Sequence, residues 1–171
     1  MRSTRMTSTR PAGARTTAPA MARRVALFAA VSAVATAGIA GCAGPLTVEP
    51  GPSATTAACA QVLVALPSEY AGLPRRETTS QATAAWGQDP ADAVQLRCGI
   101  DPPGPTTDLC TTVGEVDWVV DDVEGLVRYR SFGRIPAVEV TLPADRQDGL
   151  DVLLSSLAAP MSTWQRTRTC G

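Results

Sequence analysis

The chain contains no histidine, no lysine and no asparagine among its 171 residues. Without histidine, neither a Ser-His-Asp triad nor a Cys-His dyad can form, and the commonest protein ligand of zinc is missing. The serines lie in neither a GxSxG nor an SxxK motif, which argues against a serine hydrolase. Composition therefore disfavours several enzyme classes, and we expect neither a metal ion nor an organic cofactor.

The chain also lacks an apolar run long enough for an ordinary membrane-spanning helix. Its longest run, residues 25–40, follows Arg23-Arg24 and is shorter than the roughly 20 residues that such a helix needs. It ends in Ile39-Ala40-Gly41-Cys42, a lipobox, in which small residues precede a cysteine that accepts a diacylglyceryl group. We expect residues 1–41 to be a cleaved signal peptide and Cys42 to be lipidated.

This signal places the mature protein on the outer face of the cytoplasmic membrane, attached to the membrane through Cys42. Met21 is an alternative start, since it would give a signal peptide of ordinary length. Arg23-Arg24 matches a twin-arginine export signal only loosely, so we favour the general secretory route.

Cleavage before Cys42 makes the protein acidic. All six arginines of residues 1–41 are removed, which leaves nine arginines against sixteen acidic residues and a net charge of −7. Such a surface repels nucleic acid, and no basic stripe offsets it. We therefore expect no nucleic-acid partner.

Four cysteines remain after Cys42 in a domain that is expected to be exported. An even number in that setting predicts two disulfides, for which three pairings are possible. We expect Cys98 to pair with Cys110, closing a proline-rich loop, and Cys59 to pair with Cys170, joining the ends of the domain. A metal site of four thiolates is the alternative, but no CxxC pair is present.

The mature chain divides into a linker and one domain. Residues 42–56 are rich in proline and glycine and predict a flexible linker, whereas residues 57–171 suffice for a single core. Apolar residues at helical spacing predict one helix near Cys59–Leu66 and another near Leu150–Leu157.

Alternating apolar residues predict four strands between these helices, at residues 94–98, 116–120, 127–131 and 138–142. Short connections favour an antiparallel arrangement. The expected fold is a single two-layer α+β domain of about four antiparallel strands with an N-terminal and a C-terminal helix.

A series of short motifs runs through the mature domain: Cys59 with Leu63 and Leu66-Pro67, residues 72–76 (GLPRR), 86–87 (WG), 96–99 (LRCG) and 116–118 (VDW), and Gly133-Arg134 with Pro136. In this order they resemble an actinobacterial lipoprotein family, domain of unknown function 3515. The resemblance covers nearly all of the mature domain. It implies a location in the cell envelope and adds no catalytic residue.

Two groups of residues are candidates for facing a ligand. Trp86 lies beside a turn, where its side chain would be either an exposed platform or part of the core, whereas the phase of Trp118 indicates core packing. Arg97, Arg128 and Arg130, with Arg134, could bind an anionic ligand, since guanidinium groups suit carboxylate and phosphate. The alternative is that acidic neighbours pair with these arginines.

Glu115 and Asp117 form the best candidate for a catalytic pair of carboxylates, although acidic residues near strand ends are usually only solvated. We therefore expect a non-enzymatic binding or scaffolding protein of the cell envelope, with another envelope protein or the cell wall as its partner. The alternatives are a carboxylate-dependent hydrolase of envelope glycan or peptide, and a small-ligand-binding lipoprotein.

Overall fold

The computed structural model describes residues 44–171. The expected signal peptide, both candidate start methionines and Cys42 lie outside the described residues. No helix within the described part is long and apolar enough to cross a membrane.

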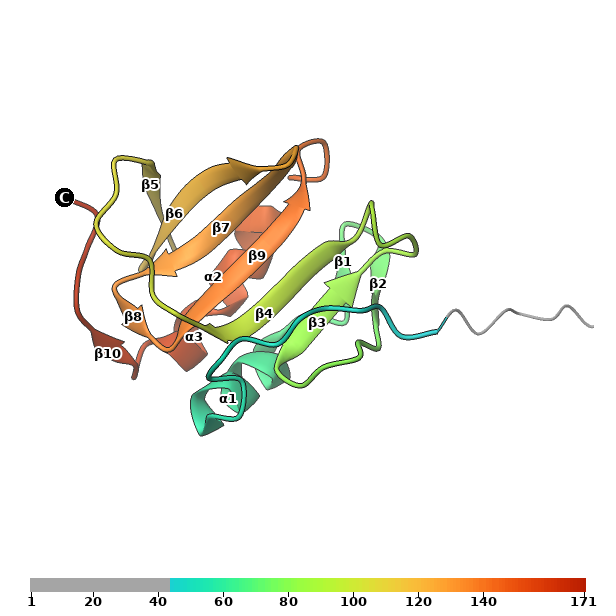
Figure 1. Cartoon of the computed structure of the whole chain (residues 1–171), viewed down its shortest axis with the longest axis horizontal. Coiled ribbons are helices and arrows are strands. Elements are labelled where there is room, and N and C mark those ends of the chain that lie inside the picture. Colours follow the sequence, from blue (N-terminus) through green and yellow to red (C-terminus); the bar gives the residue numbers. More distant parts are fainter. Residues whose placement is uncertain (1–43) are drawn as a thin grey trace, which may run out of the picture. The chain divides into compact units, whose positions relative to one another are not determined.

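A mixed-length antiparallel sheet of eight strands forms the centre of the domain (Figure 1). Its strands lie in the order β1-β2-β3-β4-β9-β7-β6-β5. Their bounds are β1 Glu69–Tyr70, β2 Leu73–Arg76, β3 Thr83–Trp86, β4 Val94–Ile100, β5 Leu109–Val113, β6 Val116–Val123, β7 Leu126–Phe132 and β9 Ala137–Pro143. A separate two-stranded pair joins β8 (Arg134–Ile135) to β10 (Gln165–Arg166).

Three short helices pack on one face of the large sheet: α1 (Ala57–Ala65), α2 (Leu150–Ser156) and α3 (Ala158–Met161). Alternate residues of the strands point into this interface because side chains on a strand alternate between its two faces. The main core forms here, with Trp86, Trp118, Leu96 and Leu153 among its buried side chains.

The expected α+β fold of about four strands is wrong, because the domain is mostly β. The four expected strands are present as β4, β6, β7 and β9, but the sheet has eight strands. Strand β3 was not predicted because all four of its residues are buried, so its sequence does not alternate between apolar and polar residues. Strand β1 has only two residues, and β2 contains Pro74.

We call residues 44–56 the strap. The flexible linker expected for residues 42–56 is wrong for this part, because the strap is packed against the domain. Leu46 and Val48 are buried against Ala85 and Ala93, in a second apolar cluster separate from the main core. Since Ala84 and Trp86 face the helices, the alternate residue Ala85 faces the opposite side, and the strap covers it there.

Backbone contacts fix the strap in place. The Leu46 N–H donates to the Glu77 carbonyl at 2.9 Å, and the Thr79 N–H donates to the Leu46 carbonyl at 2.9 Å. Further along, a side chain at Gly51 would collide with the backbone of Gly99, and one at Gly99 would collide with the backbone of Ser53 and Ala54. The folded domain therefore begins before residue 57.

The four cysteines form two disulfides, as expected, but in another pairing. Cys59 of α1 bonds to Cys98 of β4, and Cys110 of β5 bonds to Cys170 near the end of the chain. The expected bond between Cys98 and Cys110 is wrong because β9, β7 and β6 lie between β4 and β5 in the sheet. The expected bond between Cys59 and Cys170 is also wrong, because each of these cysteines is bonded to another partner.

Candidate binding site on the polar face of the sheet

The face of the sheet opposite the helices carries charged and polar side chains on its four central strands. Strand pairing aligns Arg97, Glu139 and Arg130 in one row across β4, β9 and β7. A second row across β4, β9, β7 and β6 contains Gln95, Thr141, Arg128 and Asp121. We call these seven residues the polar face.

The charged members of the polar face form a connected network. Arg97 Nε donates to Glu139 Oε1 at 2.6 Å, and Arg128 Nε lies 4.0 Å from the other oxygen of that carboxylate. Arg128 also pairs with Asp121, which Arg130 contacts at 3.2 Å. The three arginines predicted to face a ligand are thus brought together, and the alternative that acidic neighbours pair with them is also correct.

The network holds Asp121 in its ionised form. The hydrogen bond from Arg128 lowers the pKa of Asp121 below its ordinary value of 3.8, and the charge of Arg130 acts in the same direction against the effect of burial. The same hydrogen bond raises the pKa of Arg128. Asp121 therefore serves as a fixed negative charge and is not suited to donate a proton at neutral pH.

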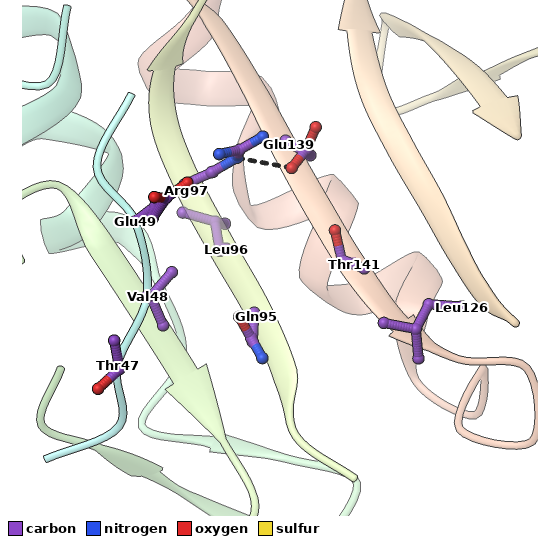
Figure 2. Close-up of a pocket in the computed structure, with 9 residues that line it drawn as sticks. All are labelled: Thr47, Val48, Glu49, Gln95, Leu96, Arg97, Leu126, Glu139 and Thr141. Carbon is purple, nitrogen blue, oxygen red and sulfur yellow. Dashed lines mark hydrogen bonds and ion pairs between the residues drawn. The ribbon is translucent and has the colours of Figure 1, made fainter. Parts of the chain in front are cut away.

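A cavity of about 310 Å³ lies between the strap and the polar face (Figure 2). Thr47, Val48 and Glu49 of the strap form one side, and Gln95, Arg97 and Thr141 are among the sheet residues that line it. Leu126, at the start of β7, adds an apolar surface. The volume of the cavity is at the lower end of the range for small-ligand sites, which is roughly 300–1,000 Å³.

The charged groups of the cavity, Glu49, Arg97 and Glu139, lie at one end (Figure 2). Arg97 is 32% exposed and uses only Nε on Glu139, so its two terminal nitrogens have no hydrogen-bond partner among the described residues. Glu49 is exposed and has no ion-pair partner in the described part of the chain. Figure 2 shows Glu49, Arg97 and Glu139 near one another, with Leu126 at the far end. Arg97 can donate hydrogen bonds to a ligand here, and Glu49 can accept them.

Trp86 does not contribute to this site, and its prediction as a ligand-facing residue is wrong. Its side chain is 0% exposed in the main core, where Nε1 donates to the Pro67 carbonyl at 3.2 Å. Strand β3 places Trp86 on the helix face, opposite the strap, so the ring fills the core. Trp118 is likewise fully buried, as its phase along the strand predicted.

Arg134 lies apart from the other three arginines. Its guanidinium is buried and donates to the carbonyls of Met161 at 3.2 Å, Trp164 at 3.3 Å and Glu115 at 3.4 Å. These bonds tie the end of α3 to the turn between β5 and β6. Arg134 therefore has a structural role and does not join the polar face.

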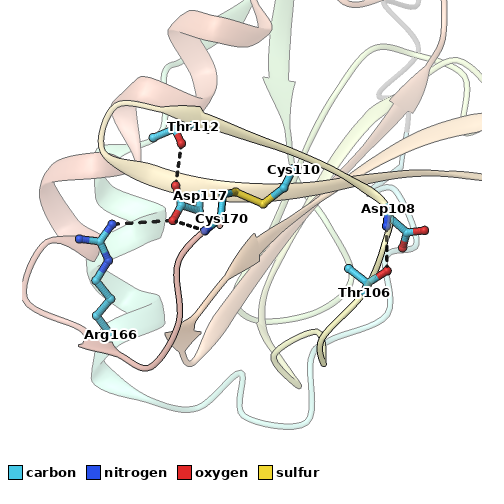
Figure 3. The surroundings of a disulfide bond; sticks show 7 residues. All are labelled: Thr106, Asp108, Cys110, Thr112, Asp117, Arg166 and Cys170. Carbon is cyan, nitrogen blue, oxygen red and sulfur yellow. Dashed lines mark hydrogen bonds and ion pairs between the residues drawn. A yellow bond between two sulfur atoms is a disulfide. The ribbon is translucent and has the colours of Figure 1, made fainter.

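Asp117 also has a structural role (Figure 3). Its carboxylate is buried and accepts hydrogen bonds from Thr112 Oγ1 at 2.7 Å and from the Cys170 N–H at 3.0 Å, with Arg166 3.8 Å away. Glu115, by contrast, is exposed in a left-handed turn conformation with a φ of 66°. The carboxylate of Asp117 fastens the C-terminal segment, so the predicted catalytic pair loses one of its members to this structural role.

Sequence patterns indicated the sheet side of the site but missed the strap side. Glu139 and Thr141 on β9, like Arg97 on β4, alternate along the strand with buried apolar residues, which indicates the face opposite the core. The strap was missed because prolines and glycines surround its short alternation of Leu46 and Val48 with Thr47 and Glu49. That alternation was the available signal.

Among residues 44–171, no cluster of three or more cysteine or acidic side chains is placed to hold a metal ion. Residues 20–164 match the family model described as "Protein of unknown function (DUF3515)". Comparisons with curated proteins and with solved structures gave no match.

Proposed function

Because the chain belongs to the DUF3515 family of proteins of unknown function, we propose a function from its own residues: it is a lipid-anchored binding protein of the cell envelope. In this proposal, the cavity between the strap and the polar face holds a short peptide with a free carboxylate. The protein acts without catalysis, on the outer face of the cytoplasmic membrane.

The lipobox supports the anchor and the location. Residues 39–42 combine the small residues required for cleavage with the cysteine that receives the lipid. The disulfides of the mature domain agree with an exported protein, since such bonds persist in oxidising surroundings.

The observation that carries the binding function is that the two terminal nitrogens of Arg97, at the cavity, have no hydrogen-bond partner within residues 44–171. A guanidinium binds a carboxylate through two parallel hydrogen bonds, and Glu139 already holds Arg97 through the other side of the group. Gln95 and Thr141 offer the amide and hydroxyl groups that peptide bonds require, while Glu49 can accept from a ligand N–H. A short peptide satisfies all of these groups.

The environment of the carboxylates supports binding rather than hydrolysis. Asp117 is committed to Thr112 and Cys170, and the acidic residues of the polar face are held by arginines. A general acid needs a pKa near the working pH, whereas the pKa of Asp121 is displaced in the opposite direction. The pair predicted for the hydrolase alternative, Glu115 and Asp117, is therefore not available for acid and base chemistry, because Asp117 is committed to structural hydrogen bonds.

Calorimetric titration of the mature chain in detergent micelles tests the proposal. The probes are tripeptides and tetrapeptides with a free carboxyl terminus, together with the same peptides amidated at that terminus. We expect free-acid peptides to bind, and Arg97→Gln to weaken binding about tenfold or more, because charge-assisted hydrogen bonds are lost. Arg168→Gln is the matched control, since Arg168 is exposed and does not line the cavity.

Equal affinity for free and amidated peptides would contradict the carboxylate as the recognised group. Thr141→Val provides a second variant, which removes one hydroxyl from the cavity without changing charge and should also weaken binding. Failure of every peptide to bind the wild-type chain would refute the proposed peptide-binding function.

A further inference from the structure

The strap is fixed to the domain almost up to the expected lipid attachment site. Gly44 is the first described residue, and its carbonyl accepts a hydrogen bond from Arg76 Nη2 at 2.6 Å. The other terminal nitrogen of Arg76 donates to Gln88 at 3.0 Å and to Gly87 at 3.3 Å. We call Gly44, Arg76, Gly87 and Gln88 the anchor end of the domain; it lies beside β2 and β3 (Figure 1).

This clamp lies two residues after the expected lipid attachment site. Only Ala43 separates Cys42 from Gly44, so the two Cα atoms can be no more than about 7 Å apart. A flexible linker over residues 42–56 would instead hold the domain about 20 Å from its anchor. The fixed strap thus removes most of the clearance that the sequence composition predicts.

The charge near the anchor end is compatible with phospholipid headgroups. Arg75 and Arg76 lie on β2, and neither has a carboxylate within ion-pair distance among the described residues. The mature chain as a whole carries a net charge of −7, which anionic lipid repels. Arg76 therefore places one positive charge at the anchor end, with no carboxylate paired to it among the described residues, on a molecule that anionic lipid otherwise repels.

We infer that the anchor end lies directly against the phospholipid headgroups, so that the acylated domain rests on the bilayer and not on a flexible stalk. This inference relies on the proposed lipidation of Cys42. It also limits where the ligand is met: Glu49 lies seven residues after Cys42, so the candidate cavity is within about 25 Å of the lipid anchor. Peptides carried close to the membrane surface are then within its reach.

Neutron reflectometry of the acylated chain on a supported bilayer of phosphatidylcholine and phosphatidylglycerol measures the hydrated gap beneath the domain. We expect a gap below about 10 Å for the wild type, because only Ala43 separates the lipidated residue from the clamped Gly44. A flexible Gly-Ser insertion of linker length between Ala43 and Gly44 leaves all described contacts in place and should widen the gap by about 20 Å.

Arg76→Gln and Arg75→Gln form a matched pair of variants, since both remove one positive charge from β2. Arg76 holds the strap, whereas Arg75 donates to the Leu63 carbonyl at 3.0 Å. Arg76→Gln should release Gly44 and Pro45 and widen the hydrated gap by at most about 7 Å. Arg75→Gln should leave the gap unchanged. An equal increase in both variants would overturn the role of the clamp.

A wild-type gap as wide as that of the insertion variant would overturn the inference while leaving the anchor intact. Mass spectrometry of the same sample reports acylation separately. A chain without the acyl mass on Cys42 would refute the proposed anchor itself, so the two failures are distinguishable.

Discussion

Single residues of the polar face show how a charged surface is held in a defined arrangement. Asp121 accepts from both Arg128 and Arg130, and Glu139 joins Arg128 to Arg97. The side chains of these residues are at most about one third exposed, so their pairing is better shielded from solvent than that of surface ion pairs. The arginine that faces the cavity is therefore positioned by its neighbours before any ligand arrives.

Asp121 should stabilise the fold in a pH-dependent way. Because its pKa is lowered in the folded state, its contribution is complete above the ordinary pKa of 3.8 and is lost as the pH falls through the folded-state pKa. Asp121→Asn should lower the free energy of unfolding by about 1–2 kcal/mol at pH 7, and the difference should vanish in strong acid. Urea unfolding followed by circular dichroism over a pH series measures this.

Asp122→Asn is the control for this prediction. Asp122 is the next residue of β6, is exposed, and has no ion-pair partner among the described residues. A deficit in Asp121→Asn that persists below the folded-state pKa, or an equal deficit in Asp122→Asn, would show that the ion pairs do not cause the effect.

At the residue scale, sequence patterns predicted which side chains share a face but not what covers that face. Arg97, Arg128 and Arg130 follow the period of two along their strands, and the structure brings them together. Trp86 could not be assigned in this way, since β3 is covered by helices on one face and by the strap on the other. Burial on both faces depends on distant segments, which local periodicity does not report.

At the scale of elements, the two disulfides fasten the parts of the domain that the sheet does not hold. Cys59–Cys98 joins α1 to a central strand, and both cysteines are 0% exposed. Cys110–Cys170 joins the edge strand β5 to the C-terminal segment, and both of its cysteines are partly exposed. The two bonds therefore differ in access to solvent.

Reduction should follow this difference in exposure. Under mild reductant, Cys110 and Cys170 should be alkylated before Cys59 and Cys98. Removing the buried bond in the double variant Cys59→Ser, Cys98→Ser should lower the free energy of unfolding by about 4 kcal/mol. Peptide mapping after timed alkylation measures the order. Without reduction, peptides linking Cys98 to Cys110 would contradict the structure.

Strand order explains why the disulfide pairing could not be predicted from the sequence. Cys98 and Cys110 are close in the chain but lie four positions apart in the sheet, since β9, β7 and β6 are inserted between their strands. The four strands with one buried face were found from alternation, whereas β1, β2, β3 and β5 were missed. The pairing depends on long-range strand order, which the short patterns do not encode.

In the whole molecule, the two faces of the large sheet are covered differently. The helices bury one face in the main core, while the strap covers only part of the opposite face and leaves the cavity beside Arg97. The strap also connects that cavity to the proposed lipid anchor, since Glu49 lines the cavity and Gly44 is clamped by Arg76. Ligand binding and membrane attachment would thus share one segment of chain.

The most direct test of this account is a map of where a free-carboxyl peptide contacts the mature chain. All three tryptophans are buried, so their fluorescence is a poor reporter, and amide ¹⁵N–¹H spectra are preferable. We expect peptide-dependent shifts at residues 47–49, 95–97 and 139–141, with α1 and α2 unaffected. Shifts confined to other parts of the domain, or none at saturating peptide, would contradict this expectation.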